Sequence, residues 1–579
     1  MTGSLEASPD APRAFPSLVH LLAAAEEADA RRPAFTYVER GDEAVASRRL
    51  GELLGAARVV AARLQALTSP GDRVLVVFPH GLEFIEAFLG CLLAGVVAVP
   101  AVPPQDRRAA ESWAAVARAA RPSAILTPKS VAPLVEGARG PGILAPVLFL
   151  EDVLAAEALP WRLPALGKDS VAYLQFTSGS TGTPKGVVVT HGNLLHNCGL
   201  LREALDVVPA GPLVSWLPFF HDWGLLGCVV FPLFMGMPCY LMSPAEFLYA
   251  PARWLKAISR FRARISCAPN FAYEACCQRI SESEKASFDL AGWQVAMVGA
   301  EPVRSETLER FTASFRACGF RPEAFHPSYG LAEASLIVSG GRRRGPPLAL
   351  AVERRDLEAR RVAPARAASG EGARTLVGCG RPLGDQRLRV VDAESRAPCG
   401  PGEVGEIWVS GDSVAAGYWE QAEETGRTFG ARLDGEEGRF LRTGDLGFLW
   451  EGELFLCGRA KDVIIKAGNN YFAEDVERSA GRSHPSLRSG CGAAFAVEAE
   501  GAERLVIVHE LEFGCRADPA VVGSIQKGVF ADLGVLADAV VLLRPGSLPK
   551  TTSGKVRRQR VRTLFLGEEL DAVSSWRCW

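Results

Sequence analysis

Short apolar runs alternate with longer, partly polar stretches through the first four-fifths of the chain. Four of these runs have the length and apolar content of buried strands: RVLVVF (73–78), SAILTP (123–128), VAYLQF (171–176) and RISCAP (264–269). Strands separated by helical stretches indicate layered α/β structure in which most strands are parallel. No unit of roughly 20 to 50 residues repeats along the sequence, so the pattern excludes a solenoid.

A segment rich in Arg, Ala, Gly and Pro, residues 339–375, interrupts this alternation. It holds one weak strand candidate, LALAV (348–352), and is otherwise predicted to be irregular. Long irregular segments inside compact domains are uncommon and are usually functional or mobile. We therefore expect an insertion with a role of its own at this place.

Beyond the insertion, the pattern changes to strands of an antiparallel or barrel-like piece, as in RLRVVD (387–392) and GEIWVSG (405–411). The polar stretch GRAKD (458–462) joins two apolar strands, which is typical of a hinge. The remaining residues have the size of a small domain, with strands at 504–511 and 539–543 on either side of a helix.

The sequence thus predicts an α/β protein of two parts. The first, residues 1–457, is a large N-terminal domain of layered α/β subdomains plus a small barrel-like piece. The second, residues 458–579, is a small, mobile α+β C-terminal domain. A chain of 579 residues exceeds what one hydrophobic core usually supports, in agreement with this division.

Composition excludes several classes of protein. The apolar content of 48% and charged content of 22% are those of an ordinary globular protein, and a net charge of −2 argues against a dedicated nucleic-acid binder. The longest apolar run, residues 87–99, is too short to span a bilayer and predicts a buried helix leading into a strand. The N-terminus lacks the pattern of a secretory signal, and the 14 cysteines lack zinc-ligand spacing. We expect a cytoplasmic protein with reduced thiols.

The glycine-rich string FTSGSTGTPKG (176–186) is the first candidate for chemistry. A strand that runs into such a loop presents backbone N–H groups and hydroxyls with little steric cover, and such nests bind anions. Lys185 adds a positive charge, but Gly186 follows it, whereas a P-loop has Ser or Thr there. Alone, a loop of this composition is more often a solvated turn.

Four further strings follow in order. SYGLAEAS contains Tyr329 and Glu333, RTGDL contains Asp445, GRAKD contains Arg459, and PKTTSGKVRR contains Lys555. Singly, the carboxylates would be surface groups and the lysine part of a solvated basic run. Together, from about residue 30 to 560, the set resembles the adenylate-forming superfamily of acyl-CoA synthetases, luciferases and peptide-synthetase adenylation domains.

The resemblance implies ATP and Mg²⁺ as cofactors and a role for each string. Activation of a carboxylate by ATP brings two anions together, so cations and oriented donors must neutralise the growing charge. Glu333 would bind Mg²⁺, and Lys555 would reach both the carboxylate oxygen and the α-phosphate. The residues that would hold the leaving pyrophosphate are Thr177, Ser178, Gly179, Ser180, Thr181, Gly182 and Lys185.

The same resemblance implies the nucleoside pocket. Tyr329 would stack on adenine, and Asp445 would accept hydrogen bonds from the ribose hydroxyls with support from Arg459. The remaining candidates along the nucleotide are Gly299, Ala300, Glu301, Ser328 and Gly330, and His221 joins Lys555 and Lys185 as a catalytic candidate.

One string discriminates between branches of this superfamily. SWLPFFHDWGLLG (215–227) offers no partner for a substrate ammonium group, which disfavours an amino acid, and it resembles the matching string of fatty acyl-AMP ligases. Other strings similar to that branch occupy residues 71–104, 242–273, 299–303, 327–341, 385–392 and 411–419.

In such ligases the insertion packs against the small domain and hinders the rotation that coenzyme A ligases use. The resemblance therefore implies transfer of the acyl group to the phosphopantetheine thiol of an acyl carrier protein, for polyketide or lipopeptide synthesis. Because the chain ends soon after SGKVRRQR, we expect that carrier to be a separate protein.

Several positions depart from the family pattern: Val298 replaces Asn, Asn469 replaces Arg, Ala473 replaces Pro, and Trp223 replaces Met. These departures concern carrier docking and chain length rather than adenylation. Trp223 either lines the acyl tunnel and shortens the preferred chain, or is an ordinary core tryptophan.

Two other functions remain open from the sequence. The chain is a medium- or long-chain acyl-CoA synthetase if the segment 339–375 does not restrain the small domain. It is a weak acyl-adenylate binder or carrier-recruiting scaffold if the site is inactive, although intact Lys185, Glu333, Asp445 and Lys555 argue against this.

Overall fold

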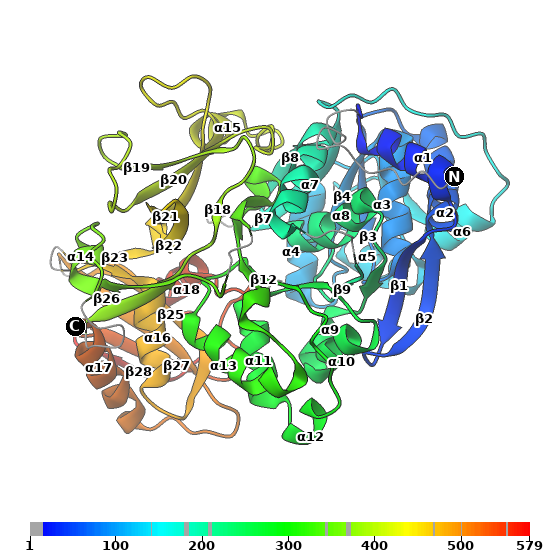
Figure 1. Ribbon diagram of the computed structural model, residues 1–579. Helices are drawn as coiled ribbons and strands as arrows, with labels where there is room; N and C mark the ends of the chain where they lie inside the picture. The colour runs from blue at the N-terminus through cyan, green and yellow to red at the C-terminus, as the bar shows by residue number, and fades with distance from the viewer. Residues whose placement is uncertain are drawn as a thin grey trace.

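A computed structural model of the chain provides the fold (Figure 1). It describes residues 15–140, 142–178, 184–206, 211–341, 345–365, 372–466, 469–499, 501–551 and 554–579.

The first large sheet has six strands in the order β6-β5-β3-β4-β7-β8. All neighbours are parallel except β7 and β8, which form an antiparallel hairpin. Every residue of helix α3 (Leu82–Ala94) except Glu83 is buried, because the helix is almost entirely apolar. It leads through Gly95 into β4, as the apolar run 87–99 predicts. The strands are β3 (Arg73–Val77), β4 (Val97–Ala101), β5 (Ala124–Thr127), β6 (Val147–Phe149), β7 (Val171–Ser178) and β8 (Pro184–Thr190).

The second large sheet has seven strands in the order β13-β12-β11-β9-β10-β1-β2, and only β1 and β2 are antiparallel. Its strands are β1 (Pro33–Glu39), β2 (Glu43–Arg49), β9 (Leu213–Ser215), β10 (Cys239–Leu241), β11 (Ile265–Pro269), β12 (Val295–Gly299) and β13 (Phe325–Pro327). The four strands predicted from apolar runs are thus confirmed as β3, β5, β7 and β11.

Helices of the large domain pack around these sheets. Most of them share one extensive hydrophobic cluster with the strands, whereas the helices at residues 107–120 and 132–138 belong to a second cluster with the six-stranded sheet. The helices around the sheets are α1 (Leu18–Asp29), α2 (Leu50–Leu67), α4 (Arg107–Ala120), α5 (Ala132–Ala138), α6 (Leu150–Ala155), α7 (His191–Leu205), the π-helix η3 (Trp223–Val230), α8 (Phe231–Met235), α9 (Pro244–Tyr249), α10 (Ala252–Arg260), α11 (Asn270–Arg279), α12 (Glu282–Lys285) and α13 (Ser305–Phe315).

The predicted barrel-like piece is an antiparallel sheet, β19-β20-β21-β22, with helix α15 beside it. A short sheet, β14-β15-β18, joins it to the large domain. The elements are β14 (Tyr329–Gly330), β15 (Ile337–Gly340), β18 (Arg381–Pro382), β19 (Arg387–Val391), β20 (Gly405–Ser410), α15 (Ala422–Phe429), β21 (Leu441–Trp450) and β22 (Glu453–Arg459).

The insertion is more regular than predicted. The expected strand LALAV is confirmed as β16 (Ala349–Glu353), but it pairs in an antiparallel sheet with β17 (Ala373–Val377), and helix α14 (Arg354–Glu358) follows it. The prediction of an otherwise irregular segment was therefore wrong. Strand β17 was hidden because Arg374 lies inside it at a buried position, where an apolar residue is expected.

A small C-terminal α+β domain completes the fold. A two-stranded sheet, β23-β24, precedes a four-stranded sheet, β25-β26-β27-β28, which has one hydrophobic cluster with α16 and α17 and another with α18. The elements are β23 (Val463–Lys466), β24 (Asn469–Phe472), α16 (Ala473–Arg482), β25 (Leu487–Ala499), β26 (Ala502–Leu511), α17 (Pro519–Leu533), β27 (Ala539–Leu543), α18 (Arg558–Leu566) and β28 (Ala572–Arg577). The boundary between residues 457 and 458, and the mobility of this domain, stay predictions.

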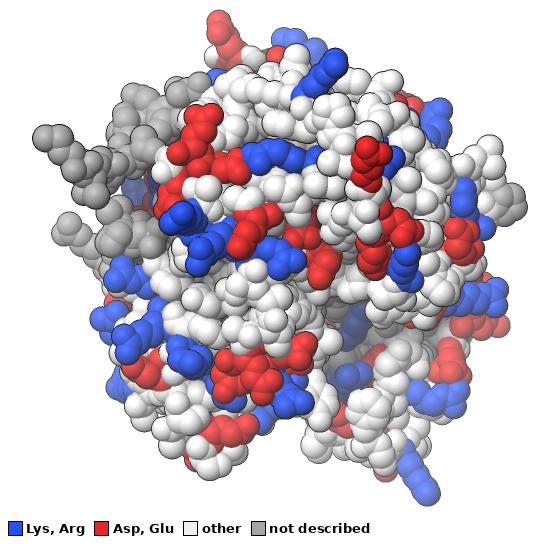
Figure 2. Space-filling view, turned by 90° about the vertical axis from the view of Figure 1, so that its right-hand side faces the viewer, with Lys and Arg blue, Asp and Glu red and all other residues white. Residues whose placement is uncertain are grey.

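The surface charges and the helix lengths do little to narrow the choice of function. Lys and Arg side chains are interspersed with Asp and Glu over the face drawn in Figure 2. Among the described residues, no helix combines the length and apolar content needed to cross a bilayer.

Candidate active site

The carboxyl ends of three parallel strands in the seven-stranded sheet, β9, β12 and β13, lead to candidate residues. The chain leaves β9 toward His221, β12 toward Glu301 and β13 toward Tyr329. In open α/β sheets, ligands bind outside the carboxyl ends of the strands. We therefore expect a binding site at this edge of the sheet.

Tyr329 is buried and joins the large domain to the barrel-like sheet. Its hydroxyl donates a hydrogen bond to Asp445 Oδ2 at 2.8 Å, and Asp445 Oδ1 lies 3.1 Å from Arg459 Nε. Asp445 and Arg459 face each other across β21 and β22, so the ion pair follows from strand register. Burial, then the charge of Asp445, raises the pKa of Tyr329, so the phenol stays a donor.

Lys185 and Glu333 meet around a residue that the sequence interpretation left without a role, Tyr418. The Tyr418 hydroxyl donates to Glu333 Oε1 at 2.8 Å, and Lys185 Nζ lies 5.0 Å from the centre of the Tyr418 ring. Lys185 also forms an ion pair with Glu424, a second residue that the interpretation missed. The string GDSVAAGYW (411–419) did carry Tyr418, but only as a family resemblance.

Lys555 brings the small domain to the same site. Desolvation by its surroundings, then the charge of Arg459, lowers the pKa of Lys555, and nearby Asp222, Glu301 and Asp445 oppose this shift. The residue is nevertheless exposed, so water reaches it although the surrounding atoms reduce its hydration. Residues from both domains therefore share one electrostatic environment.

The segment that carries Lys555 is anchored inside the small domain. Arg558, at the start of α18, donates to both oxygens of Glu477 and to Asp462 Oδ2, at distances between 2.6 and 2.9 Å. Asp462 lies in the predicted hinge GRAKD. This contact links the position of Lys555 directly to the hinge.

His221 and Asp222 lie at the start of η3. Burial, with a smaller contribution from Lys555, lowers the pKa of His221 to about 4, so its imidazole is neutral at pH 7. Its Nε2 atom is buried and has no hydrogen-bond partner among the described residues. Desolvation raises the pKa of Asp222, although the Trp223 backbone N–H and Lys555 oppose the shift. Buried polar atoms in proteins are nearly always hydrogen-bonded, so a polar group of a bound substrate is a suitable partner for this Nε2 atom.

The GAEP segment has an unusual backbone. Ala300 adopts φ of 60°, in the left-handed region that non-glycine residues rarely occupy and that often marks functional sites. The Glu301 side chain accepts a hydrogen bond from Phe271 N at 2.6 Å, and desolvation raises its pKa against the opposing effects of that bond and of Lys555.

Two candidate glycines are required by packing alone. A Cβ atom on Gly299 would lie 2.6 Å from the carbonyl oxygen of Ser328, and one on Gly330 would lie 1.8 Å from that of Leu336. Ser328 itself is half-buried next to Tyr329, and its N–H donates to Val298 O at 3.0 Å. These contacts explain the glycines without a ligand.

The glycine-rich string is described only at its two ends. Thr177, at the end of β7, pairs directly with Lys185 in β8. The Ser178 side chain and all of Gly179, Ser180, Thr181 and Gly182 lie outside the described residues.

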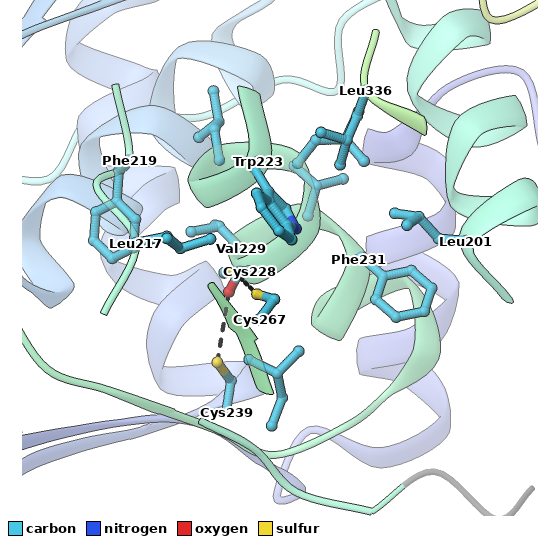
Figure 3. Packing of buried hydrophobic residues seen from close by; sticks show 14 of the residues in the cluster. Leu201, Leu217, Phe219, Trp223, Cys228, Val229, Phe231, Cys239, Cys267 and Leu336 are labelled. Carbon is cyan, nitrogen blue, oxygen red and sulfur yellow. Dashed lines mark hydrogen bonds between the residues drawn. The ribbon is translucent and has the colours of Figure 1, made fainter. Parts of the chain in front are cut away.

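Trp223 lies in the central hydrophobic cluster. Its side chain is 8% exposed and lies among Leu336, Val229 and Leu217 in Figure 3. A Cβ atom on Gly227, one turn along η3, would approach the Trp223 ring to 2.9 Å. π-Helical turns of this kind occur frequently at functional sites, but the burial alone also fits a core residue.

The insertion contacts the small domain through charged and apolar groups. Arg374 in β17 lies 3.1 Å from Asp475, with its guanidinium 4.8 Å from the Phe472 ring centre. Arg354 donates to Asp532 O at 2.7 Å. Phe472 also shares a hydrophobic cluster with Val352, Leu357 and Leu376 of the insertion hairpin and its helix.

Comparison with known proteins places this arrangement in a family. The family model for AMP-binding enzymes matches residues 23–419, and the model for the Disco-interacting protein 2-like AMP domain matches residues 461–575. The chain is 42% identical over 571 residues to the medium-chain-fatty-acid–[acyl-carrier-protein] ligase JamA of Moorena producens (strain JHB), with 96% of each chain covered. The chain belongs to the fatty acyl-AMP ligase branch of the AMP-binding enzyme family.

Solved structures of such ligases share the whole fold. A structure from work on fatty acyl-adenylate ligases of E. coli and L. pneumophila covers 96% of this chain and 98% of its own, with a TM-score of 0.87 and 32% identity. The L. pneumophila fatty acyl-adenylate ligase in complex with acyl adenylate and pyrophosphate covers 98% of both chains, with a TM-score of 0.74 and 36% identity. The predicted fold class, with a large N-terminal and a small C-terminal domain, is confirmed.

Proposed function

We propose that this ligase activates a fatty acid with ATP to an acyl-adenylate, releases pyrophosphate, and transfers the acyl group to the phosphopantetheine thiol of an acyl carrier protein. The observation that carries the proposal is that the charges of Asp222, Glu301 and Asp445, which lie in the large domain, all act on the Lys555 ammonium of the small domain. The relative named as an acyl-carrier-protein ligase, 42% identical over almost the whole chain, supports the acceptor.

The adenylation step needs its negative charges neutralised at defined points. A carboxylate oxygen of the fatty acid attacks the α-phosphorus of ATP, and the bond from that phosphorus to the pyrophosphate oxygen breaks. The Lys555 ammonium would bind both the attacking oxygen and an α-phosphate oxygen, while Lys185 would bind the leaving pyrophosphate. Asp445 would accept from the ribose hydroxyls through the lone pairs that its hydrogen bond from Tyr329 and its ion pair with Arg459 leave free.

The residues also suit a bound divalent cation. Glu333 provides a carboxylate, the hard oxygen ligand that Mg²⁺ prefers, and one of its oxygens is already fixed by Tyr418. Bound between Glu333 and the phosphates, Mg²⁺ would supply charge neutralisation. In the second step the carrier thiolate attacks the acyl carbonyl carbon, and AMP leaves.

One assay tests this function. The purified protein is incubated with a saturated fatty acid, ATP and Mg²⁺, first without an acceptor and then with coenzyme A or a phosphopantetheinylated carrier protein. We expect acyl-AMP and pyrophosphate in every reaction and acyl-carrier as the main thioester. Efficient acyl-CoA formation would instead favour an acyl-CoA synthetase, and binding without pyrophosphate release would favour a scaffold.

The position of Trp223 predicts an effect on chain length. If its indole fills the acyl tunnel, Trp223→Met opens space for about two methylenes, each worth about 0.8 kcal/mol when buried. The ratio of kcat/KM for a longer over a shorter fatty acid should then rise about 15-fold. Competition assays with mixed chain lengths measure this ratio.

The matched control is Trp450→Met, because Trp450 is a half-buried tryptophan in a different hydrophobic cluster. It should leave the chain-length profile unchanged. A Trp223→Met protein that is less stable but keeps the original profile would assign Trp223 to the core alone.

A further inference from the structure

Tyr418 occupies a fixed position between the glycine-rich hairpin and α15. Its backbone forms a bridge with Val187 in β8, and the next residue, Trp419, donates its N–H to Gly186 O at 2.7 Å. The Tyr418 N–H donates to Thr425 Oγ1 at 2.9 Å, and its side chain is 8% exposed. The ring is therefore tied to the strand that carries Lys185 and to the helix that carries Glu424.

The hydroxyl of Tyr418 acts on Glu333. A glutamate side chain rotates freely about its last bond, so its two oxygens have no fixed direction unless a partner holds one. The 2.8 Å hydrogen bond to Oε1 provides that partner. A carboxylate only accepts hydrogen bonds, so the Tyr418 hydroxyl is the donor in this pair.

The ring of Tyr418 acts on Lys185. The ammonium lies 5.0 Å from the ring centre, within the range of a cation–π interaction, and it forms an ion pair with Glu424. One side chain thus contacts both the carboxylate and the cation of the proposed phosphate site, through two different parts of its structure.

We propose that Tyr418 is a positioning residue that orients Glu333 toward a divalent cation and Lys185 toward the pyrophosphate group of ATP. This proposal rests on the proposed function, because it assumes those two ligands. Residues that hold a metal ligand in place typically change metal affinity 10- to 100-fold when altered, although they do not touch the metal.

The test measures metal binding directly. Mn²⁺, which replaces Mg²⁺ and is visible by electron paramagnetic resonance, is titrated into the protein with α,β-methylene-ATP, which is not cleaved. Tyr418→Phe keeps the ring and removes the hydroxyl, so we expect Mn²⁺ affinity to fall about 10- to 100-fold. Adenylation should be restored by a matching excess of Mg²⁺, which a merely structural defect would not allow.

A second variant separates the two parts of the side chain. Tyr418→Leu also removes the ring below Lys185, so pyrophosphate, added as a competitor of ATP, should bind more weakly to it than to Tyr418→Phe. The control is Tyr240→Phe, because Tyr240 is half-buried and stacks on Phe261 in another part of the fold. It should leave both affinities unchanged.

Glu333→Gln distinguishes failure of this inference from failure of the proposed function. If Glu333→Gln weakens Mn²⁺ binding and Tyr418→Phe does not, the role of Tyr418 is overturned while the metal site stands. If neither variant weakens Mn²⁺ binding, Glu333 is not the metal ligand, and both the metal site and the role of Tyr418 are overturned. Thermal unfolding confirms that each variant is folded.

Discussion

Replacing Lys555 by alanine should reduce acyl-adenylate formation by about 10²- to 10³-fold or more, with little change in ATP affinity. The size follows from the loss of one preorganised donor where negative charge develops. The effect should fall on kcat rather than on substrate binding, because the ammonium is needed most when the carboxylate oxygen approaches the α-phosphate. Pyrophosphate release and equilibrium binding of ATP measure the two quantities separately.

The control for this variant is Lys527→Ala, since Lys527 is an exposed lysine of the same small domain, on α17. It should behave like the unmodified protein. If a folded Lys555→Ala protein releases pyrophosphate at nearly the original rate, Lys555 is not the catalytic cation.

The environment of Lys555 also predicts the alkaline side of the pH profile. Desolvation and Arg459 lower the pKa of this ammonium, and the cation exists only below that pKa. Adenylation should therefore decline, as pH rises, earlier than an ordinary exposed lysine would allow. Lys555→Arg stays charged throughout this range, so whatever activity it retains should not show that decline.

The sequence was sufficient for most of the fold because its apolar runs are short, regular and separated by helical stretches. For this reason the runs at β3, β5, β7 and β11 could be predicted as strands. Strand β17 could not be predicted, since a buried arginine interrupts its apolar pattern. The charge of that arginine is balanced by Asp475 of the small domain. That partner is about a hundred residues away and cannot be inferred locally.

Some residues of the candidate site could likewise be identified from the sequence, and others could not. Tyr329, Asp445 and Arg459 were identified through family strings, and the structure brings them into direct contact. Tyr418 and Glu424 were missed because their importance comes from contacts with Glu333 and Lys185 across the fold, not from a local pattern. Gly299 and Gly330 show the opposite case, in which the resemblance suggested a ligand role and packing already explains the residue.

The insertion should decide which thiol receives the acyl group. Its hairpin and helix contact the small domain through Arg374 with Asp475, Arg354 with Asp532, and an apolar cluster that includes Phe472. Rotation of the small domain would break these contacts, so they stabilise the arrangement in which Lys555 lies at the site. A bias of about 3 kcal/mol leaves under roughly one per cent of molecules in the rotated arrangement. We therefore expect negligible acyl-CoA from the unmodified protein.

Point variants test this without removing the insertion. In Arg354→Ala/Arg374→Ala, Asp475 keeps Arg478 as a partner at 3.1 Å, which limits the cost of leaving a buried carboxylate. If the two changes weaken the interface by about 2 kcal/mol, the rotated population rises roughly 30-fold. Acyl-CoA should then become measurable, while acyl-AMP formation stays close to its original rate.

The control is Arg355→Ala, which removes an exposed arginine next to Arg354 on α14. It should leave the product distribution unchanged.

A carrier protein contributes binding energy from its own surface, and this energy favours the rotated arrangement. Acyl-carrier formation should therefore depend less on Arg354 and Arg374 than acyl-CoA formation does. If the double variant is folded and makes acyl-AMP but no acyl-CoA, the contacts of Arg354 and Arg374 do not exclude coenzyme A. If the unmodified protein already uses coenzyme A efficiently, the insertion does not restrain the domain, and an acyl-CoA synthetase is the better description of the activity.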